Sequence, residues 1–341
     1  MSFRPYGLSR PSVLLALSLL ACGREADPAA ALDQAGAPAG QDPPGASEEV
    51  VVRLGYQKIG PPFLLEQRDE RLVEQLQARG ARVEWVEFQA GPPLLEAMRA
   101  GAVDIGYVGE TPPVFAQAGG VPFVYVATDP PAPRAEAIIV PGGSPIQTVA
   151  QLAGKRVAVN RGSNVHYLLV RALEREKLTL ADVEVVFLAP ADARAAFDSG
   201  KVDAWVIWDP FLAAAELDGA RVLRDGQGLV DNHLFYVVRR ELAAQRPDLV
   251  RVVLDQYQEL SAWAATHHQD AARILATSSG IAYDALLRAE ERHPYGLQAI
   301  TPEVLARQQA IADAFHALGV IPQAIHTADA FLPAAAYGDA P

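Results

Sequence analysis

The residues Gly101-Ala102-Val103-Asp104 are echoed by Gly200-Lys201-Val202-Asp203, 99 residues further along the chain. Six residues after each aspartate stands a second carboxylate, Glu110 in one place and Asp209 in the other, and a proline follows within two residues. Gly-x-Val-Asp after a helix is by itself a common turn between a helix and a strand. The shared offset nevertheless favours a chain built from two similar halves.

The segments around each motif alternate between strand and helix patterns. In the first half we expect strands at 50–56, 82–88 and 103–108, with helices ending near Arg79 and Ala100. In the second half we expect strands at 156–160, 184–188 and 202–207, with helices at 165–177 and 191–199. This order predicts two α/β lobes, each with a mostly parallel sheet covered by helices.

Two further segments contain apolar, strand-like runs and are interpreted as crossings between the lobes. They are 127–140 and about 232–239, and the mainly helical region 241–332 is expected to return to the first lobe. The predicted boundaries are 50–138 with 237–341 for lobe I, and 139–236 for lobe II. Ligands of open α/β sheets bind beyond the carboxyl ends of the strands, so a cleft between hinged lobes is expected there.

The first 22 residues are typical of an export signal, with a basic start and an apolar run too short to span a bilayer. The run ends in Leu19-Leu20-Ala21-Cys22, which resembles the bacterial lipobox, whose cysteine is acylated. The alternative is a plain secretory signal with an incidental cysteine. Residues 23–49 are poor in large apolar side chains and are predicted to be a flexible tether. Together these features predict a lipid-anchored protein on the periplasmic or cell-surface side of a membrane.

Composition and motif content exclude several classes of function. With Lys+Arg 29 against Asp+Glu 41, the net charge is −12, so a general basic field for nucleic acid is absent. Cys22 is the single cysteine, which rules out an intrachain disulfide. The histidines lack metal-ligand spacing, no glycine-rich phosphate loop is present, and no nucleophile has a base beside it. We therefore expect no enzyme, cofactor or metal.

The strongest candidate site is the loop Gly162-Ser163-Asn164, which precedes an amphipathic helix. Ser and Asn commonly cap helices, and the N–H groups of the first turn attract anions, so both interpretations stand together. The corresponding loop of the first half contains Pro61 and Pro62, which have no N–H. An anion should therefore lie nearer the second half, with Gln57 and Thr111 as contributors from the first.

Glu110 and Asp209 also follow strands and could form an acid–base pair if they were held close together. We favour the alternative that each holds a backbone N–H or an arginine. Trp208 is one of several aromatic residues near these loops, and one or two of these could line a pocket for an apolar tail.

Long consecutive stretches resemble the aliphatic sulfonate-binding proteins of bacterial ABC importers, over about residues 50–318. These stretches are 55–58, 109–117, 129–133, 160–169, 190–197, 202–210 and 292–296. The resemblance implies a two-lobed periplasmic-binding-protein fold, with two sheets, helices on both faces of each sheet, and two crossing segments. It also implies a monomer that delivers a sulfonate anion to a permease driven by a separate ATPase, for sulfur uptake.

The resemblance and the residue pattern together mark ten positions as ligand-binding candidates. They are Gln57, Gly109, Glu110, Thr111, Gly162, Ser163, Asn164, Trp208, Asp209 and Arg292; for Arg292 the alternative is a structural ion pair. Taurine, nitrate or a thiamine-pyrimidine precursor are the alternative ligands, because the wider family binds all three. An enzyme on the same fold or a sensor module are alternative functions. Alanine at both Ser163 and Asn164 is expected to lower sulfonate affinity with little loss of stability.

Overall fold

The computed structural model describes residues 49–336 apart from 59, 67 and 69. The predicted signal segment, the predicted tether up to residue 48 and Cys22 lie outside the described residues. Within the described part, no helix combines the length and the apolar character needed to cross a membrane.

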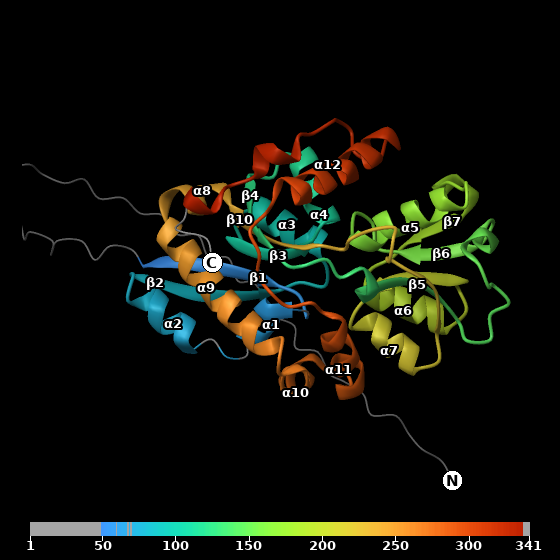
Figure 1. Cartoon of the computed structure of the whole chain (residues 1–341), viewed down its shortest axis with the longest axis horizontal. Helices are drawn as coiled ribbons and strands as arrows, with labels where there is room; N and C mark the ends of the chain where they lie inside the picture. Colours follow the sequence, from blue (N-terminus) through green and yellow to red (C-terminus); the bar gives the residue numbers. More distant parts are fainter. Residues whose placement is uncertain (1–48, 59, 67, 69, 337–341) are drawn as a thin grey trace, which may run out of the picture. The chain divides into compact units, whose positions relative to one another are not determined.

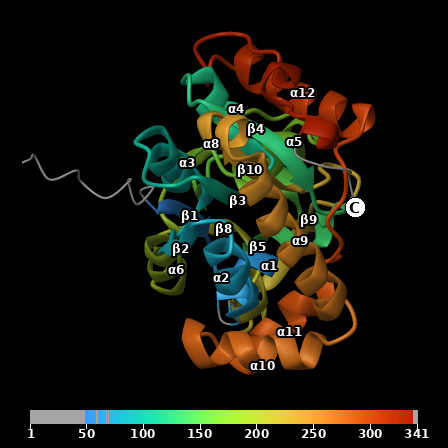
Figure 2. The same ribbon diagram turned by 90° about the vertical axis from the view of Figure 1, so that its left-hand side faces the viewer.

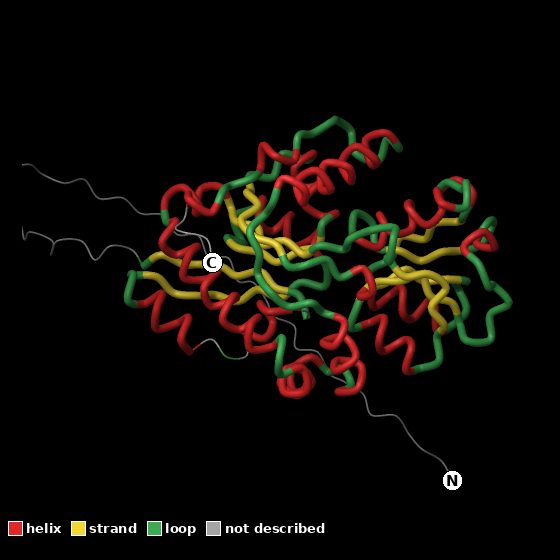
Figure 3. The backbone as a smooth tube through the Cα atoms, in the orientation of Figure 1, coloured by secondary structure: helices red, strands yellow, loops and turns green. Residues whose placement is uncertain are grey.

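The described strands form two five-stranded sheets, which appear as two separate groups in Figure 3. The first sheet has the order β2-β1-β3-β10-β4, formed by Ala81–Glu87, Val50–Tyr56, Ile105–Gly109, Leu234–Arg239 and Phe123–Thr128. The second has the order β7-β6-β8-β5-β9, formed by Glu184–Phe187, Arg156–Val159, Ala204–Trp208, Glu136–Val140 and Arg221–Asp225. Each predicted strand is therefore present, with bounds that differ from the predicted ones by at most two residues.

The two sheets repeat one plan. In the first, β1 is parallel to β2 and β3, whereas β10 is antiparallel to β3 and β4. In the second, β6 is parallel to β7 and β8, whereas β5 is antiparallel to β8 and β9. Each antiparallel strand follows the strands of one half in sequence but joins the sheet of the other half. The predicted crossing segments are thus strands that the two halves exchange.

Helices cover both faces of each sheet (Figure 1). One hydrophobic cluster joins the first sheet to α1 (Gly60–Glu66), α2 (Glu70–Gln77) and α9 (Pro247–Ala264). Another cluster joins the same sheet to α3 (Gly91–Arg99) and α4 (Thr111–Ala118). In the second sheet, α5 (Asn164–Arg175) packs in one cluster, and α6 (Pro190–Asp198) and α7 (Phe211–Leu217) pack in another. The predicted first helix is divided into α1 and α2, and the fold class is as expected.

The region after β10 is helical, as predicted. It forms α8 (Arg240–Gln245), α9, α10 (His268–Ser279), α11 (Tyr283–Arg292) and α12 (Pro302–Ala317), and Figure 2 shows α9 running toward α10 and α11. Helix α9 packs against α1 and α2 of the first half, and the region also reaches the second half. Helix α11 packs against α7, and Phe315 of α12 contacts Phe115 and His166, which belong to α4 and α5. The helical region therefore connects both sheets.

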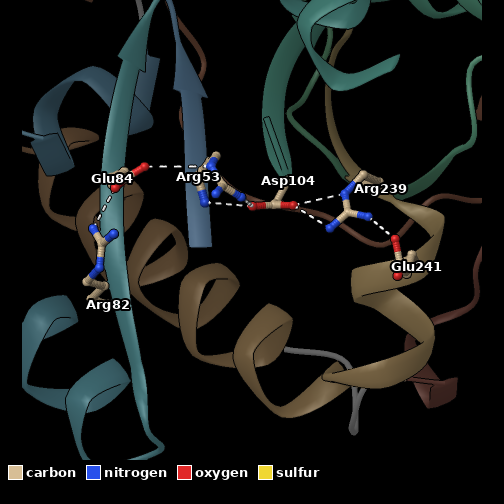
Figure 4. Close-up of polar contacts among 6 residues, drawn as sticks. All are labelled: Arg53, Arg82, Glu84, Asp104, Arg239 and Glu241. Atoms are coloured by element: carbon tan, nitrogen blue, oxygen red, sulfur yellow. Dashed lines mark hydrogen bonds and ion pairs between the residues drawn. The ribbon is translucent and has the colours of Figure 1, made fainter. Parts of the chain in front are cut away.

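The two aspartates of the repeated motif have the same structural role. Asp104, which is 1% exposed, accepts the backbone N–H of Arg53 (2.9 Å) and the side chain of Arg239 (2.7 Å), so it joins β1 to β10 (Figure 4). Asp203 likewise accepts the backbone N–H of Arg156 (2.9 Å) and its side chain (2.9 Å). The sequence echo thus corresponds to a repeated anchor for the first strand of each half.

Candidate functional site

A cavity lies where the carboxyl ends of strands from both sheets meet. Its empty space of about 740 Å³ includes the part that is open to solvent. Gln57 follows β1, Gly109 ends β3 and Trp208 ends β8, and all three line it. The other lining residues are Lys58, Gly60, Gly91, Pro112, Ala132, Ala135, Ser163, Asn164, Asp209, Pro210, Asn232, Leu234, Leu286, Ala289, Glu290 and His293. Its position agrees with the general rule for ligand sites in α/β sheets.

The start of α5 carries backbone N–H groups without acceptors in the part of the chain that the structure describes, and Ser163 and Asn164 line the cavity there. Gly162 has a φ of +72°, a left-handed conformation that glycine adopts without strain, and it turns the chain into the helix. The N–H groups of Asn164 and Val165 have no acceptor among the described residues, as is usual for a first helical turn. Ser163 occupies the N-cap position of α5, but its side chain does not cap the helix, because its Oγ donates to the carbonyl of Asn160 (2.7 Å) instead of accepting an N–H.

The side chain of Asn164 connects the second half to the first. Its Oδ1 accepts the N–H of Thr111 at the start of α4 (3.1 Å). Its Nδ2 donates to Oδ1 of Asn232 (2.6 Å) and to the carbonyl of His233 (3.5 Å), both in the second crossing segment. Asn164 is buried, and these bonds join α5, α4 and the crossing segment at one wall of the cavity.

Gln57 and Thr111 are placed differently from one another. Gln57 lines the cavity and its Nε2 donates to the carbonyl of Tyr107 (3.1 Å). Thr111 is completely buried and does not line the cavity, although its Oγ1 has no hydrogen-bond partner in the described part of the chain. Thr111 contributes to the site indirectly, because its N–H donates to the side chain of Asn164, which lines the cavity.

Glu110 holds the second crossing segment. Its Oε1 accepts the N–H of Asn232 (3.3 Å) and its Oε2 accepts the N–H of His233 (2.9 Å). Burial raises the pKa of Glu110 to about 8, although the two N–H donors act in the opposite direction. The interpretation that this carboxylate binds backbone N–H groups is confirmed.

Asp209 and Arg292 form an ion pair beside the cavity. Asp209 accepts the N–H of Ala213 (2.9 Å) and lies 3.4 Å from Nη1 of Arg292, whose Nη2 lies 2.5 Å from Oε2 of Glu216. Burial raises the pKa of Asp209 to about 6, and the charge of Arg292 opposes that rise. The contacts of Arg292 therefore agree with the alternative of a structural ion pair. Its ion pairs with Asp209 and Glu216 join α11 to α7.

Six of the ten candidate residues line the cavity, and four lie behind its wall. The four are Glu110, Thr111, Gly162 and Arg292. The sequence reasoning missed the contribution of α11 and the residue after it, which present Leu286, Ala289, Glu290 and His293 to the cavity. The spacing of these four residues, which places them on one helical face, was the signal that could have found them.

A second buried carboxyl lies next to the cavity wall. Glu136, the first residue of β5, is fully buried, and neither of its carboxyl oxygens has a hydrogen-bond partner among the described residues. Burial, assisted by the charge of Glu110, raises its pKa well above the usual range. The folded protein therefore keeps a proton on Glu136 that the unfolded chain releases near its ordinary pKa.

This proton predicts that stability falls as the pH rises above the ordinary range of a glutamate. We expect Glu136→Gln to flatten this decline in the free energy of unfolding by up to about 1.4 kcal/mol per pH unit. The comparison is made above about pH 6.5, where His166, whose pKa burial lowers to about 4, is mostly neutral in both states. Glu110, whose pKa burial raises to about 8, adds to the decline in both proteins. Urea unfolding at several pH values measures the slope, with Glu184→Gln, at an exposed strand start, as control. An unchanged slope in Glu136→Gln would refute the assignment.

Among the residues that the structure describes, no group of three His, Cys, Asp or Glu side chains is arranged to hold a metal ion. Two lobes that exchange strands around a cavity, with free N–H donors on one wall, define the periplasmic solute-binding class of protein. A protein-family model described as "Substrate binding domain of ABC-type glycine betaine transport system" matches residues 70–276.

Comparison with known proteins narrows this class. An Escherichia coli (strain K12) protein described as an aliphatic sulfonates-binding protein is 39% identical over 281 residues, covering 82% of this chain and 88% of the relative. The alkanesulfonate-binding protein SsuA from Xanthomonas axonopodis pv. citri, bound to MOPS, has a TM-score of 0.79 at 39% identity, covering 84% of this chain and 99% of that one. The periplasmic aliphatic sulphonate-binding protein SsuA from Escherichia coli has a TM-score of 0.75 at 38% identity, covering 83% and 92%.

The chain belongs to the family of aliphatic sulfonate-binding proteins of ABC import systems. The three relatives named above are substrate-binding proteins rather than enzymes, and this chain is likewise a binding protein.

Proposed function

We propose that this chain captures aliphatic sulfonates in the cavity and delivers them to the permease of an ABC importer for sulfur uptake. The observation that carries the proposal is the pair of free N–H groups at the start of α5, which open beside a cavity with apolar walls. A sulfonate carries three acceptor oxygens and no proton, so it needs donors alone, and a helix start supplies them.

The walls suit the rest of such a ligand. Trp208, Leu234, Leu286 and Ala289 supply apolar surface for an aliphatic tail. Relatives described as sulfonate-binding support the same ligand class.

Isothermal titration calorimetry tests the proposal with ethanesulfonate, butanesulfonate, taurine, nitrate, sulfate and glycine betaine. We expect the sulfonates to bind at least about tenfold more tightly than nitrate or sulfate, a difference of about 1.4 kcal/mol. Glycine betaine, a carboxylate with a quaternary ammonium group, is included as a control ligand that carries no sulfonate group. Absence of binding by every sulfonate at millimolar concentration would overturn the proposal.

We further propose that Cys22 is acylated and that residues 23–49 tether a monomeric binding domain to the membrane. The lipobox-like sequence 19–22 supports the anchor. A tether would raise the effective concentration of the domain near its permease. Mass measurement of the mature N-terminal peptide would detect the lipid, and an unmodified Cys22 would exclude it.

A further inference from the structure

The cavity wall formed by α11 carries a carboxyl group with no role in the proposed capture of the sulfonate. Leu286, Ala289 and Glu290 line the cavity from this helix, and His293 lines it from the position after the helix end. Glu290 is 4% exposed, and its Oε2 accepts a hydrogen bond from the hydroxyl of Tyr295. Among the described residues, the bond from Tyr295 is the one hydrogen bond that the Glu290 carboxyl group makes.

Each of the other titratable groups that line the cavity has a titratable partner of the opposite kind within 4.0 Å. Lys58 lies 3.5 Å from Oε1 of Glu87, and Asp209 lies 3.4 Å from Arg292. Nε2 of His293 lies 3.5 Å from Oδ2 of the buried Asp129, which also accepts the hydroxyl of Tyr236 (3.1 Å). Glu290 forms no ion pair within 4.0 Å among the described residues.

An unmatched carboxylate is unfavourable in a cavity that binds an anion, because like charges repel and burial removes water. Burial accordingly raises the pKa of Glu290, while the Tyr295 hydroxyl and the charge of His293 oppose that rise. His293 is already engaged with Asp129, so it leaves Glu290 without a close partner. A cation brought by the ligand would supply that partner.

We propose that Glu290 receives the ammonium group of the ligand, so that the preferred ligands are zwitterionic aminoalkanesulfonates. The inference rests on the proposed function, because the sulfonate end must be held at the start of α5. An ammonium group donates up to three hydrogen bonds, and its bond to a carboxylate is charge-assisted. The apolar residues Leu286 and Ala289 beside Glu290 would contact the intervening methylene groups.

The test compares pairs of sulfonates that differ only in the amino group. Titration at neutral pH uses taurine against ethanesulfonate, and 3-aminopropanesulfonate against propanesulfonate. In the unmodified protein we expect the amino compound of at least one pair to bind at least about tenfold more tightly, a difference of about 1.4 kcal/mol. Glu290→Gln should abolish that preference, because Gln retains an acceptor for Tyr295 but no charge.

Glu291→Gln is the matched control, since it removes the same charge from the exposed neighbouring position on α11. It should keep the preference for the amino compound. Equal affinities within both pairs in the unmodified protein, or an undiminished preference in Glu290→Gln, would overturn the inference. Binding of ethanesulfonate by Glu290→Gln shows that the variant is folded. Failure of all sulfonates to bind would instead refute the proposed function, so the two failures are distinguishable.

Discussion

Replacement of Asn164 by alanine is expected to lower both the free energy of unfolding and the affinity for sulfonates. The change leaves the N–H of Thr111 and the Oδ1 of Asn232 without their partner in a buried region. Each unpaired buried group costs about 1–3 kcal/mol, so we expect the two groups together to lower stability by about 2–6 kcal/mol. We also expect at least a tenfold loss of affinity, because the start of α5 is no longer held to α4 and the crossing segment.

Urea unfolding and titration with ethanesulfonate measure the two effects separately. Asn160→Ala is the matched control, because the Asn160 side chain makes its one hydrogen bond to Leu188, within the second half of the chain. We expect that variant to keep most of its affinity. If Asn164→Ala loses affinity but keeps full stability, then Asn164 acts as a ligand donor alone. That result would restore the expectation drawn from the sequence.

Gly109→Ala is expected to have the largest effect on binding. A Cβ at this position would lie 2.1 Å from Oδ1 of Asn164 and 2.5 Å from its Cγ. The Asn164 side chain is fixed by three hydrogen bonds, so it cannot move aside without losing them. Overpacking of this kind costs about 1–3 kcal/mol, and the wall of the cavity must shift, so we expect sulfonate binding to fall at least a hundredfold.

A double-mutant cycle separates this clash from a backbone effect. In the Asn164→Ala background the added methyl group has room, so Gly109→Ala should cost at least 1 kcal/mol less there than in the unmodified protein. Gly143→Ala serves as control, since a Cβ there meets no atom within 4 Å, and it should be nearly neutral. Strict additivity of the two changes would contradict the proposed contact between Gly109 and Asn164.

Local sequence patterns predicted the strands and most helices, because β-branched runs and glycine stops report directly on local conformation. Val50–Tyr56 is an example, with its strand bounds predicted as they stand. The break between α1 and α2 was missed. The packing of α11 against α7 was also missed, because it depends on contacts between Arg292, Asp209 and Glu216 that are distant in sequence.

The site was predictable where it follows from position in the fold. Residues that follow strands, such as Gln57, Gly109 and Trp208, line the cavity because the carboxyl ends of strands meet there. Side-chain partners were less predictable. Asn164 pairs with Thr111 and Asn232, whereas its sequence position suggested a helix cap. The role of such a side chain depends on residues that the fold brings close from far along the chain.

The exchange of β5 and β10 has a consequence for how the protein moves and unfolds. Each half donates a strand that lies between two strands of its counterpart, β5 between β8 and β9, and β10 between β3 and β4. Neither half can complete its hydrogen-bonded ladder alone, so they should melt as one cooperative unit. The two connections also restrict relative rotation to bending about an axis through both, which would favour a single opening motion over independent twisting.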